Sequence, residues 1–190
     1  SLEKLTDLLA RSDRPVILIG GGVSRNQFKS LMPEVDRLGV PVMTTWNATD
    51  RLGASHRLYF GRPNTWGQRS SNLILQNADL VIAVGTRLGI QQTGFNWAEF
   101  VPNGEVVQID IDRTELEKGH PKVSLAICAD ANDLLKQLLN RTSAKSSWTT
   151  WVSLAKKVRD QIPLSEKVNG YFPGFLNPYD FVLKLSDLCG

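Results

Sequence analysis

Hydrophobic residues along this chain gather in short continuous runs that alternate with stretches of helical spacing. The runs, such as residues 16–19 (VILI) and 80–84 (LVIAV), are apolar at every position, which is typical of parallel strands buried on both faces. Between the runs, apolar positions recur every three or four residues, which predicts amphipathic helices. The pattern predicts strands at residues 16–19, 40–44, 80–84, 105–111 and 123–128, a weaker strand at 57–61, and helices at 1–11, 26–38, 70–77, 131–140 and 148–161.

Strands that alternate with helices indicate an α/β fold with right-handed crossovers. We therefore expect residues 1–141 to form a Rossmann-like, doubly wound parallel sheet of about five to six strands with helices on both faces. The composition changes afterwards, and residues 142–176 are predicted to be a linker with one helix. Asn177-Pro178 is typical of a helix start, and the apolar helix that it begins predicts that residues 177–190 open a further, truncated domain. On this interpretation the chain is a piece of a longer protein.

Three consecutive glycines, Gly20, Gly21 and Gly22, follow the first predicted strand and precede the predicted helix at residues 26–38. Glycine adopts positive φ values and lets a ligand approach the backbone, and the N–H groups at a helix start attract phosphate. The segment is therefore a candidate phosphate or diphosphate site, and the alternative is a tight turn without a ligand. It lacks the GxGxxG fingerprint and the acidic residue ~20 positions later, which argues against an NAD site.

Side chains suited to bind a ligand follow the other predicted strands, and they are Thr45, Trp46, Arg87, Asp110 and Asp130. Because the carboxyl ends of parallel strands meet at one edge of a sheet, we expect these residues to converge on a common crevice. Arg87 is suited to bind a phosphate with two hydrogen bonds, and Asp110 to accept one from a ribose. It is equally consistent with the sequence that Arg87 pairs with a carboxylate, that Asp110 is a solvated strand end, and that Asp130 only caps a helix.

Composition and charge exclude several classes of protein. Hydrophobic residues make up 42% of the 190-residue chain, and no apolar run approaches the ~18 residues of a membrane span. The net charge is +3, but basic residues are mixed with acidic ones, whereas nucleic-acid-binding proteins concentrate them on one face. The two cysteines, Cys128 and Cys189, lie far apart in sequence, and no secretion signal opens the chain. We expect a cytoplasmic protein without a membrane or nucleic-acid partner.

The sequence contains no arrangement that predicts a catalytic centre or a metal site. The two histidines, His56 and His120, have no neighbouring ligand at zinc spacing, and no GxSxG nucleophile motif is present. Asp110 and Asp112 are expected to alternate across a strand, which makes them a poor acid–base pair. For the aromatic residues we favour packing. Stacking of Trp46 and Trp66 on a ring-shaped ligand is the less favoured interpretation.

Several segments resemble one protein family in their order and spacing. They are RPVILIGGGVS (14–24), GVPVMTT (39–45), the G-x(4)-N segment (67–72), NADLVIAVGTRL (77–88), VVQIDID (106–112) and ICAD (127–130). Together they resemble the central domain of thiamine-diphosphate-dependent enzymes of the acetolactate synthase group. The segment LNPYDFVLKLSDL (176–188) is similar to the place where such enzymes begin their C-terminal domain.

This resemblance implies a three-domain parent that cleaves a 2-oxo acid such as pyruvate and transfers a two-carbon unit. Thiamine diphosphate and Mg²⁺ would bind to the absent N- and C-terminal domains across a subunit interface of a homo-oligomer. The piece described by this sequence would then be inactive alone.

In acetolactate synthases the central domain also binds FAD in a structural role. By matching position, the resemblance places the diphosphate and ribityl chain beside the glycines, with Thr45 and Trp46 nearby. It places Arg87 and Asp110 near the adenosine and matches Asp130 to the last aspartate of the family pattern. Residues 64–67 and 88–91 depart from that pattern, so the site could also take an ADP moiety or no nucleotide. A non-enzymatic spacer or oligomerisation module and an NAD-dependent oxidoreductase domain are competing interpretations of the whole chain.

Overall fold

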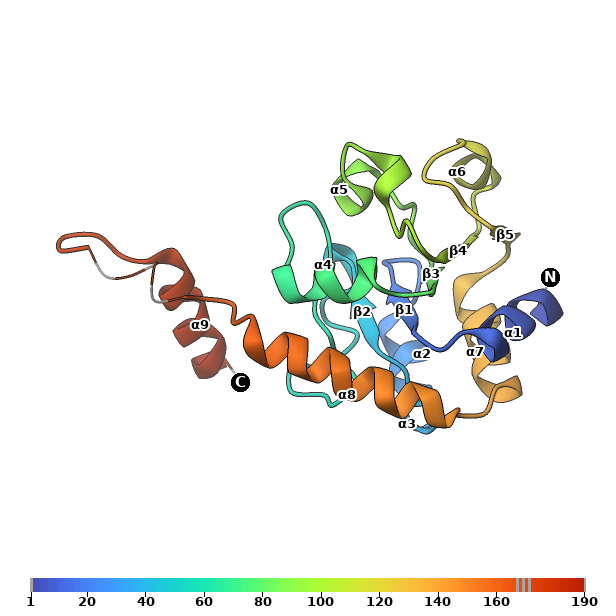
Figure 1. The fold of residues 1–190 in the computed structure, drawn as a ribbon, viewed down its shortest axis with the longest axis horizontal. Coiled ribbons are helices and arrows are strands. Elements are labelled where there is room, and N and C mark those ends of the chain that lie inside the picture. The colour runs from blue at the N-terminus through green and yellow to red at the C-terminus, as the bar shows by residue number, and fades with distance from the viewer. Residues whose placement is uncertain (1, 167, 169, 171, 190) are drawn as a thin grey trace.

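A five-stranded parallel sheet forms the centre of the computed structural model, which describes residues 2–166, 168, 170 and 172–189 (Figure 1). The strand order is β2-β1-β3-β4-β5, so the direction of winding reverses between β1 and β3. Ligands of open α/β sheets bind in the crevice outside the strand ends at such a reversal. This arrangement confirms the predicted Rossmann-like fold. The strands are β1 (Pro15–Ile19), β2 (Val42–Thr44), β3 (Leu80–Val84), β4 (Glu105–Asp110) and β5 (Leu125–Cys128).

Helices flank the sheet in two groups. α1 and α3 contact α7, whereas α4 contacts α8. The bounds are α1 (Leu2–Arg11), α2 (Arg25–Ser30), α3 (Met32–Leu38), α4 (Arg69–Gln76), α5 (Ile90–Thr93), α6 (Arg113–Glu117), α7 (Ala131–Arg141), α8 (Ser146–Gln161) and α9 (Pro178–Cys189), with 3₁₀ turns at Trp46–Ala48 and Trp97–Glu99.

Several predicted strands are shorter than expected. The strand predicted at residues 123–128 begins only at Leu125. Pro41 cannot donate a ladder hydrogen bond, and β2 begins only at Val42. The weak strand predicted at residues 57–61 is reduced to one isolated parallel bridge between Tyr59 and Val42. This bridge extends the pairing beyond β2 without adding a sixth strand to the sheet.

Two further predictions are corrected by the structure. The helix predicted at residues 26–38 is divided at Leu31 into α2 and α3, because Pro33 lacks an N–H group and its ring clashes with a continuous preceding turn. The strand predicted at 105–111 ends at Asp110, and Asp112 is already the N-cap of α6. Asp112 therefore lies outside the strand. Residues two positions apart in a strand also point to the same face, so the expected alternation of Asp110 and Asp112 is wrong.

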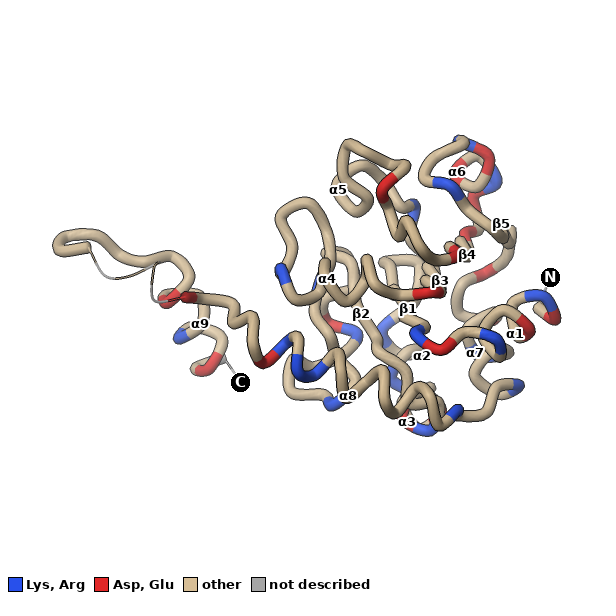
Figure 2. The backbone as a smooth tube through the Cα atoms, in the orientation of Figure 1, with Lys and Arg blue, Asp and Glu red and all other residues tan. Residues whose placement is uncertain are grey.

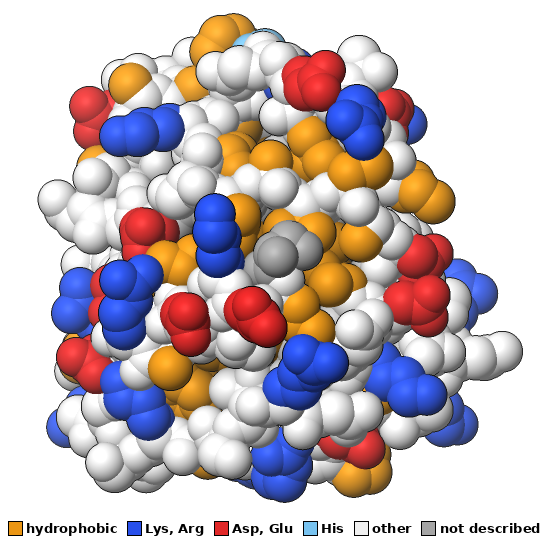
Figure 3. All heavy atoms as spheres, turned by 90° about the vertical axis from the view of Figure 1, so that its right-hand side faces the viewer, with side chains coloured by type: hydrophobic (Ala, Val, Ile, Leu, Met, Phe, Trp, Pro, Cys, Tyr) orange, Lys and Arg blue, Asp and Glu red, His pale blue; other side chains and the backbone are white. Residues whose placement is uncertain are grey.

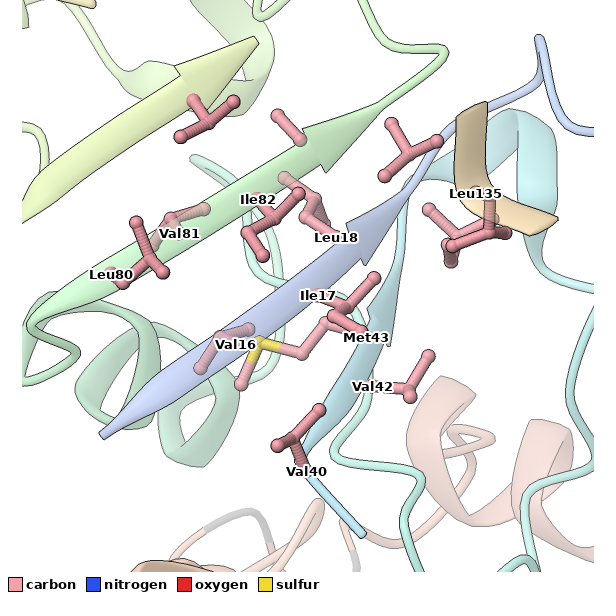
Figure 4. Close-up of a cluster of buried hydrophobic side chains, with 14 of the residues drawn as sticks. Val16, Ile17, Leu18, Val40, Val42, Met43, Leu80, Val81, Ile82 and Leu135 are labelled. Carbon is pink, nitrogen blue, oxygen red and sulfur yellow. The ribbon is translucent and has the colours of Figure 1, made fainter. Parts of the chain in front are cut away.

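The hydrophobic core lies on both faces of β1, β2 and β3. Figure 4 shows side chains of these strands projecting to either side of the sheet, with Leu135 of α7 on one side. Every residue of β1 and β3 is buried, as expected for parallel strands covered by helices on both faces. The apolar runs thus form the centre of the domain. The polar residues that follow the carboxyl ends of these strands lie at the edge of the sheet.

The two C-terminal helices differ in their packing. α8 lies along the body of the domain, and its Trp148, Trp151, Val152 and Ala155 belong to the buried core. α9 lies at the far end of the molecule from the N-terminus (Figure 1), and its apolar side chains are exposed. The helix that was predicted within a linker is therefore packed as part of the central unit.

Charge is distributed without a strong concentration of one sign. Lys and Arg alternate with Asp and Glu along the backbone (Figure 2), and hydrophobic side chains are interspersed with charged ones on the face that carries α1 and β5 (Figure 3). Among the described residues, no helix is both long and apolar enough to cross a membrane. The same part of the chain holds no group of three His, Cys, Asp or Glu side chains suited to a metal ion.

Candidate functional site

The glycine turn after β1 lies directly against the turn after β3, at the reversal of the strand order. The N–H of Gly20 donates to the carbonyl of Val84 at 2.8 Å, and the N–H of Gly22 donates to the carbonyl of Gly85 at 2.9 Å. These two N–H groups are therefore committed to the protein backbone. Gly21 is exposed, and within the described part of the chain its N–H makes no hydrogen bond. Of the three glycines, Gly21 is thus the one whose N–H is available to a ligand.

The glycines are needed here for close backbone packing. A Cβ atom on Gly20 would overlap the carbonyl oxygen of Gly85 and the side chain of Thr86, and one on Gly22 would lie 2.9 Å from the Cα of Gly85. None of the three adopts a positive φ, whereas Gly85 does, at +63°. The expectation of positive φ at the triple glycine is therefore wrong, because contact between two turns, and not a left-handed backbone, excludes larger residues.

The start of α7 joins the same cluster. The carboxylate of Asp130 accepts hydrogen bonds from the backbone N–H groups of Asn132 and Asp133, so this residue caps the helix. These hydrogen bonds hold the pKa of Asp130 below its ordinary value. Asn132 then bridges the two elements, because its Oδ1 accepts from Ser24 N at 2.8 Å and its Nδ2 donates to Gly22 O at 3.3 Å.

Asp110 is buried at the end of β4, with 8% of its surface exposed, and is not a solvated strand end. Its carboxylate accepts a hydrogen bond from the N–H of Asp112 at 3.0 Å. Its carbonyl accepts one from Ala129 N at 3.1 Å, which brings the ends of β4 and β5 together. The second carboxylate oxygen has no hydrogen bond within the described residues and is the one available to a ligand hydroxyl.

Arg87 extends from the turn after β3 with 73% of its side chain exposed. Its Nε lies 3.6 Å from a carboxylate oxygen of Glu115 in α6. The carboxylate partner considered for Arg87 is thus present in the structure. Because the pair is exposed and its atoms are far apart for a charged hydrogen bond, it leaves the guanidinium available to an anion.

Thr45 and Trp46 continue from β2 to the same edge of the sheet. The N–H of Thr45 donates to the carbonyl of Ile19 at 2.9 Å, which places this residue beside the glycine turn. Trp46 stacks on Trp66 with 6.0 Å between ring centroids. Both indoles are largely exposed, at 47% and 65%, so the pair presents aromatic surface to solvent.

A cavity of about 680 Å³ adjoins the two indoles and is bounded on the other side by the C-terminal segment. Its walls include Arg62 and Asn64. The Nδ2 atom of Asn64 is buried and has no hydrogen-bond partner among the described residues. The cavity lining contains Trp46 but neither the three glycines nor Arg87, Asp110 and Asp130. The structure therefore divides the predicted residues into a polar cluster at the strand ends and an aromatic cavity beside it.

Several residues of this region were not predicted from the sequence. Asn132 lies two residues after the capping Asp130. A second polar residue at the start of a helix was the sequence signal that could have identified it. Gln108 is a polar residue inside an apolar strand; it is 1% exposed and donates to the carbonyl of Thr86 at 3.2 Å. Lys118, which directly follows α6, contacts the turn after β3, and no local pattern distinguishes it from other surface lysines.

Comparison with known proteins defines the family. Residues 2–138 match the family described as thiamine pyrophosphate enzyme, central domain. The chain belongs to this family. It is 32% identical over 190 residues to the acetolactate synthase large subunit of Corynebacterium glutamicum, covering 96% of this chain and 29% of the relative. It is 33% identical over 164 residues to the acetolactate synthase isozyme 1 large subunit of Escherichia coli, covering 86% and 28%.

A third relative, the acetolactate synthase of Mycobacterium avium, is 31% identical over 193 residues, which cover 96% of this chain and 30% of that protein. The chain thus spans less than a third of the length of these relatives. It corresponds to the central domain that the family description names. The matched residues include the whole observed sheet, with its reversal between β1 and β3.

Proposed function

We propose that this chain is the non-catalytic central domain of an acetolactate-synthase-like enzyme and that it holds the ADP moiety of a nucleotide in a structural role. The observation that supports this proposal is that the glycine turn, the turn of Arg87 and the end of β4 with Asp110 adjoin along one edge of the sheet. An exposed guanidinium and a buried carboxylate at that place suit a diphosphate and a ribose. FAD and free ADP both contain a diphosphate and a ribose, so the proposal names the ADP moiety that they share.

The residues present fit such a group. Gly21 offers a backbone N–H, Arg87 an exposed cation, and Asp110 an unused carboxylate oxygen. If the nucleotide is FAD, the ring would extend toward Trp46 and Trp66, whose cavity is large enough for a planar ring system. In that role the cofactor would tie the ends of several strands together and perform no redox chemistry.

A spacer module without a nucleotide is the second candidate, and one specific observation favours it. The N–H groups of Gly20 and Gly22 are already bonded within the protein, so the glycine turn is explained by packing alone. In this function the domain would only separate the two catalytic domains of the parent.

Titration of the purified chain with ADP and with FAD separates these functions. We expect ADP to bind with a dissociation constant in the range of tens of micromolar, about −6 kcal/mol. Arg87→Ala should weaken binding about tenfold, because a charge-assisted hydrogen bond contributes roughly 1.5 kcal/mol or more. Arg11→Ala removes the same charge from the opposite end of the sheet and serves as the matched control.

The remaining results have defined meanings. Quenching of flavin fluorescence together with ADP binding identifies FAD as the ligand, whereas ADP binding alone identifies an ADP site. Absence of binding by both compounds at about 100 μM contradicts the nucleotide role and favours the spacer. Tight binding of NAD(H) without binding of ADP or FAD would replace the proposal by an NAD-dependent oxidoreductase domain.

For the parent protein we propose a cytoplasmic homo-oligomer in which further domains hold thiamine diphosphate and Mg²⁺. The relatives named acetolactate synthase support this proposal through the shared domain. The full-length gene product, supplied with thiamine diphosphate, Mg²⁺ and pyruvate, should release carbon dioxide and form acetolactate. A full-length protein that neither binds thiamine diphosphate nor consumes a 2-oxo acid would contradict it.

A further inference from the structure

The turn that carries Arg87 has an unusual backbone. Two of its residues lie in the left-handed region, Gly85 at φ +63° and Leu88 at φ +49°. Leu88 is 1% exposed, so its side chain is fixed in the core while its backbone adopts a conformation that is unfavourable for leucine. A conformation of this kind persists only where surrounding contacts hold it.

Lys118, which follows α6, supplies those contacts. Its ammonium group donates to the carbonyl oxygen of Arg87, lies 3.4 Å from the carbonyl oxygen of Leu88, and pairs with a carboxylate oxygen of Glu115 at 3.0 Å. The side chain is 18% exposed, so this cation is largely removed from water and its three donors each have an acceptor. Gln108 fixes the preceding carbonyl, that of Thr86, from β4.

Glu115 stands between two cations and uses a different oxygen for each. Oε2 faces Lys118 at 3.0 Å, and Oε1 faces Arg87 Nε at 3.6 Å. If Arg87 turns away, Glu115 keeps Lys118 as its partner, so its carboxylate stays paired. Breaking the contact between Arg87 and Glu115 therefore costs little free energy. Arg87 can then exchange this carboxylate for another anion.

We propose that Glu115 and Lys118 are positioning and specificity-determining residues for the ligand of Arg87. Lys118 holds the turn in the conformation that points Arg87 outward. Glu115 pairs with the Arg87 guanidinium until an anionic group of the ligand takes its place. The site then favours nucleoside phosphates over uncharged nucleosides. This inference rests on the proposed nucleotide-binding function and names the residues that regulate it.

The test compares ADP with adenosine in the purified chain and four variants. Glu115→Gln removes the competing carboxylate and should tighten ADP binding about threefold without changing adenosine binding. Glu117→Gln, an exposed carboxylate of the same helix, is the matched control for net charge and should have a smaller effect. Lys118→Met should weaken ADP binding about fivefold, and Lys118→Arg should restore part of the loss.

A merely structural role is separated from a positioning role by a double variant. In an Arg87→Ala background, Glu115→Gln should lose its effect on ADP binding, because the pair that it relieves is absent. Equal effects on ADP and adenosine, equal effects of Glu115→Gln and Glu117→Gln, or persistence of the effect without Arg87 would overturn the inference. If Lys118→Met fails to fold, the Glu115 and Lys118→Arg measurements still decide the question.

Failure of the inference is distinguishable from failure of the proposed function. If Arg87→Ala weakens ADP binding while Glu115→Gln leaves it unchanged, the nucleotide site stands and the role of Glu115 is wrong. If neither ADP nor adenosine binds the unaltered chain, the proposed function itself has failed.

Discussion

The last two helices of the chain have similar patterns and opposite surroundings. Both α8 and α9 place apolar and aromatic side chains at helical spacing. In α8, Trp148 and Trp151 are 1% and 4% exposed. In α9, Phe181 and Leu188 are 49% and 84% exposed. The pattern of a helix therefore indicates that it has an apolar face, and only the rest of the fold decides whether that face is covered.

The covering of α8 is specific. The indole Nε1 of Trp148 donates to the carbonyl of Ser12 at 2.9 Å, and that of Trp151 donates to the carbonyl of Pro15 at 3.0 Å. Buried indoles are stable only when their N–H groups have an acceptor. One acceptor lies just before β1 and the other is its first residue, so α8 closes the domain over its first strand. The apolar side chains of α9, in contrast, remain exposed.

The largest expected effect comes from breaking the α8 contact. Trp148→Ala should lower the free energy of unfolding by about 3–5 kcal/mol, because it leaves a cavity in the core and removes the hydrogen bond to Ser12. The change is measured as the midpoint of urea unfolding. Leu154→Ala in the same helix is the control, since Leu154 is 50% exposed and should cost less than about 0.5 kcal/mol. Equal midpoints for the two variants would show that α8 is only a loosely attached linker.

A smaller loss is expected at the glycine turn. In Gly20→Ala the new Cβ overlaps the backbone of Gly85, so the turns after β1 and β3 must separate, at a cost of about 1–3 kcal/mol. Gly53→Ala is the matched control, because a Cβ at that position meets no atom within 4 Å. Differential scanning calorimetry compares the two. An unchanged melting temperature for Gly20→Ala would mean that the turns do not pack as described.

The hydrophobic pattern was sufficient to predict the sheet and most of the helices. The pattern located all five strands within two residues at each end. It was clearest for β1 and β3, because burial on both faces makes every position apolar. The misplaced boundaries occur where one residue changes the backbone, as Pro33 does between α2 and α3. Short helices such as α6 escaped because five residues carry too little periodicity to be distinguished from a loop.

The candidate site was predictable by position but not by partner. Parallel strands bring their carboxyl ends to one edge, so Arg87 and Asp110 could be assigned to a common rim from sequence order alone. Which groups they contact depends on elements distant in sequence: Glu115 and Lys118 reach the turn of Arg87 from α6 and its C-terminal end. Residue type and spacing carry no information about such contacts. For the same reason, the sequence did not predict that the N–H groups of Gly20 and Gly22 donate to backbone carbonyls.

The smallest expected effect in this chain lies in α9, and it tests the comparison from the other side. Leu185 is 45% exposed, so Leu185→Asp should change the unfolding free energy of this chain by less than about 0.5 kcal/mol. In the full-length protein the same substitution should destabilise by several times that amount, because a charge would then be buried in the domain that covers α9. Ser186→Asp, which adds the same charge at an adjacent exposed position of the helix, controls for charge alone. If the two substitutions are equally mild in the full-length protein, the apolar side chains of α9 have no covering domain, and the contrast with α8 is a property of the helices themselves and not of their partners.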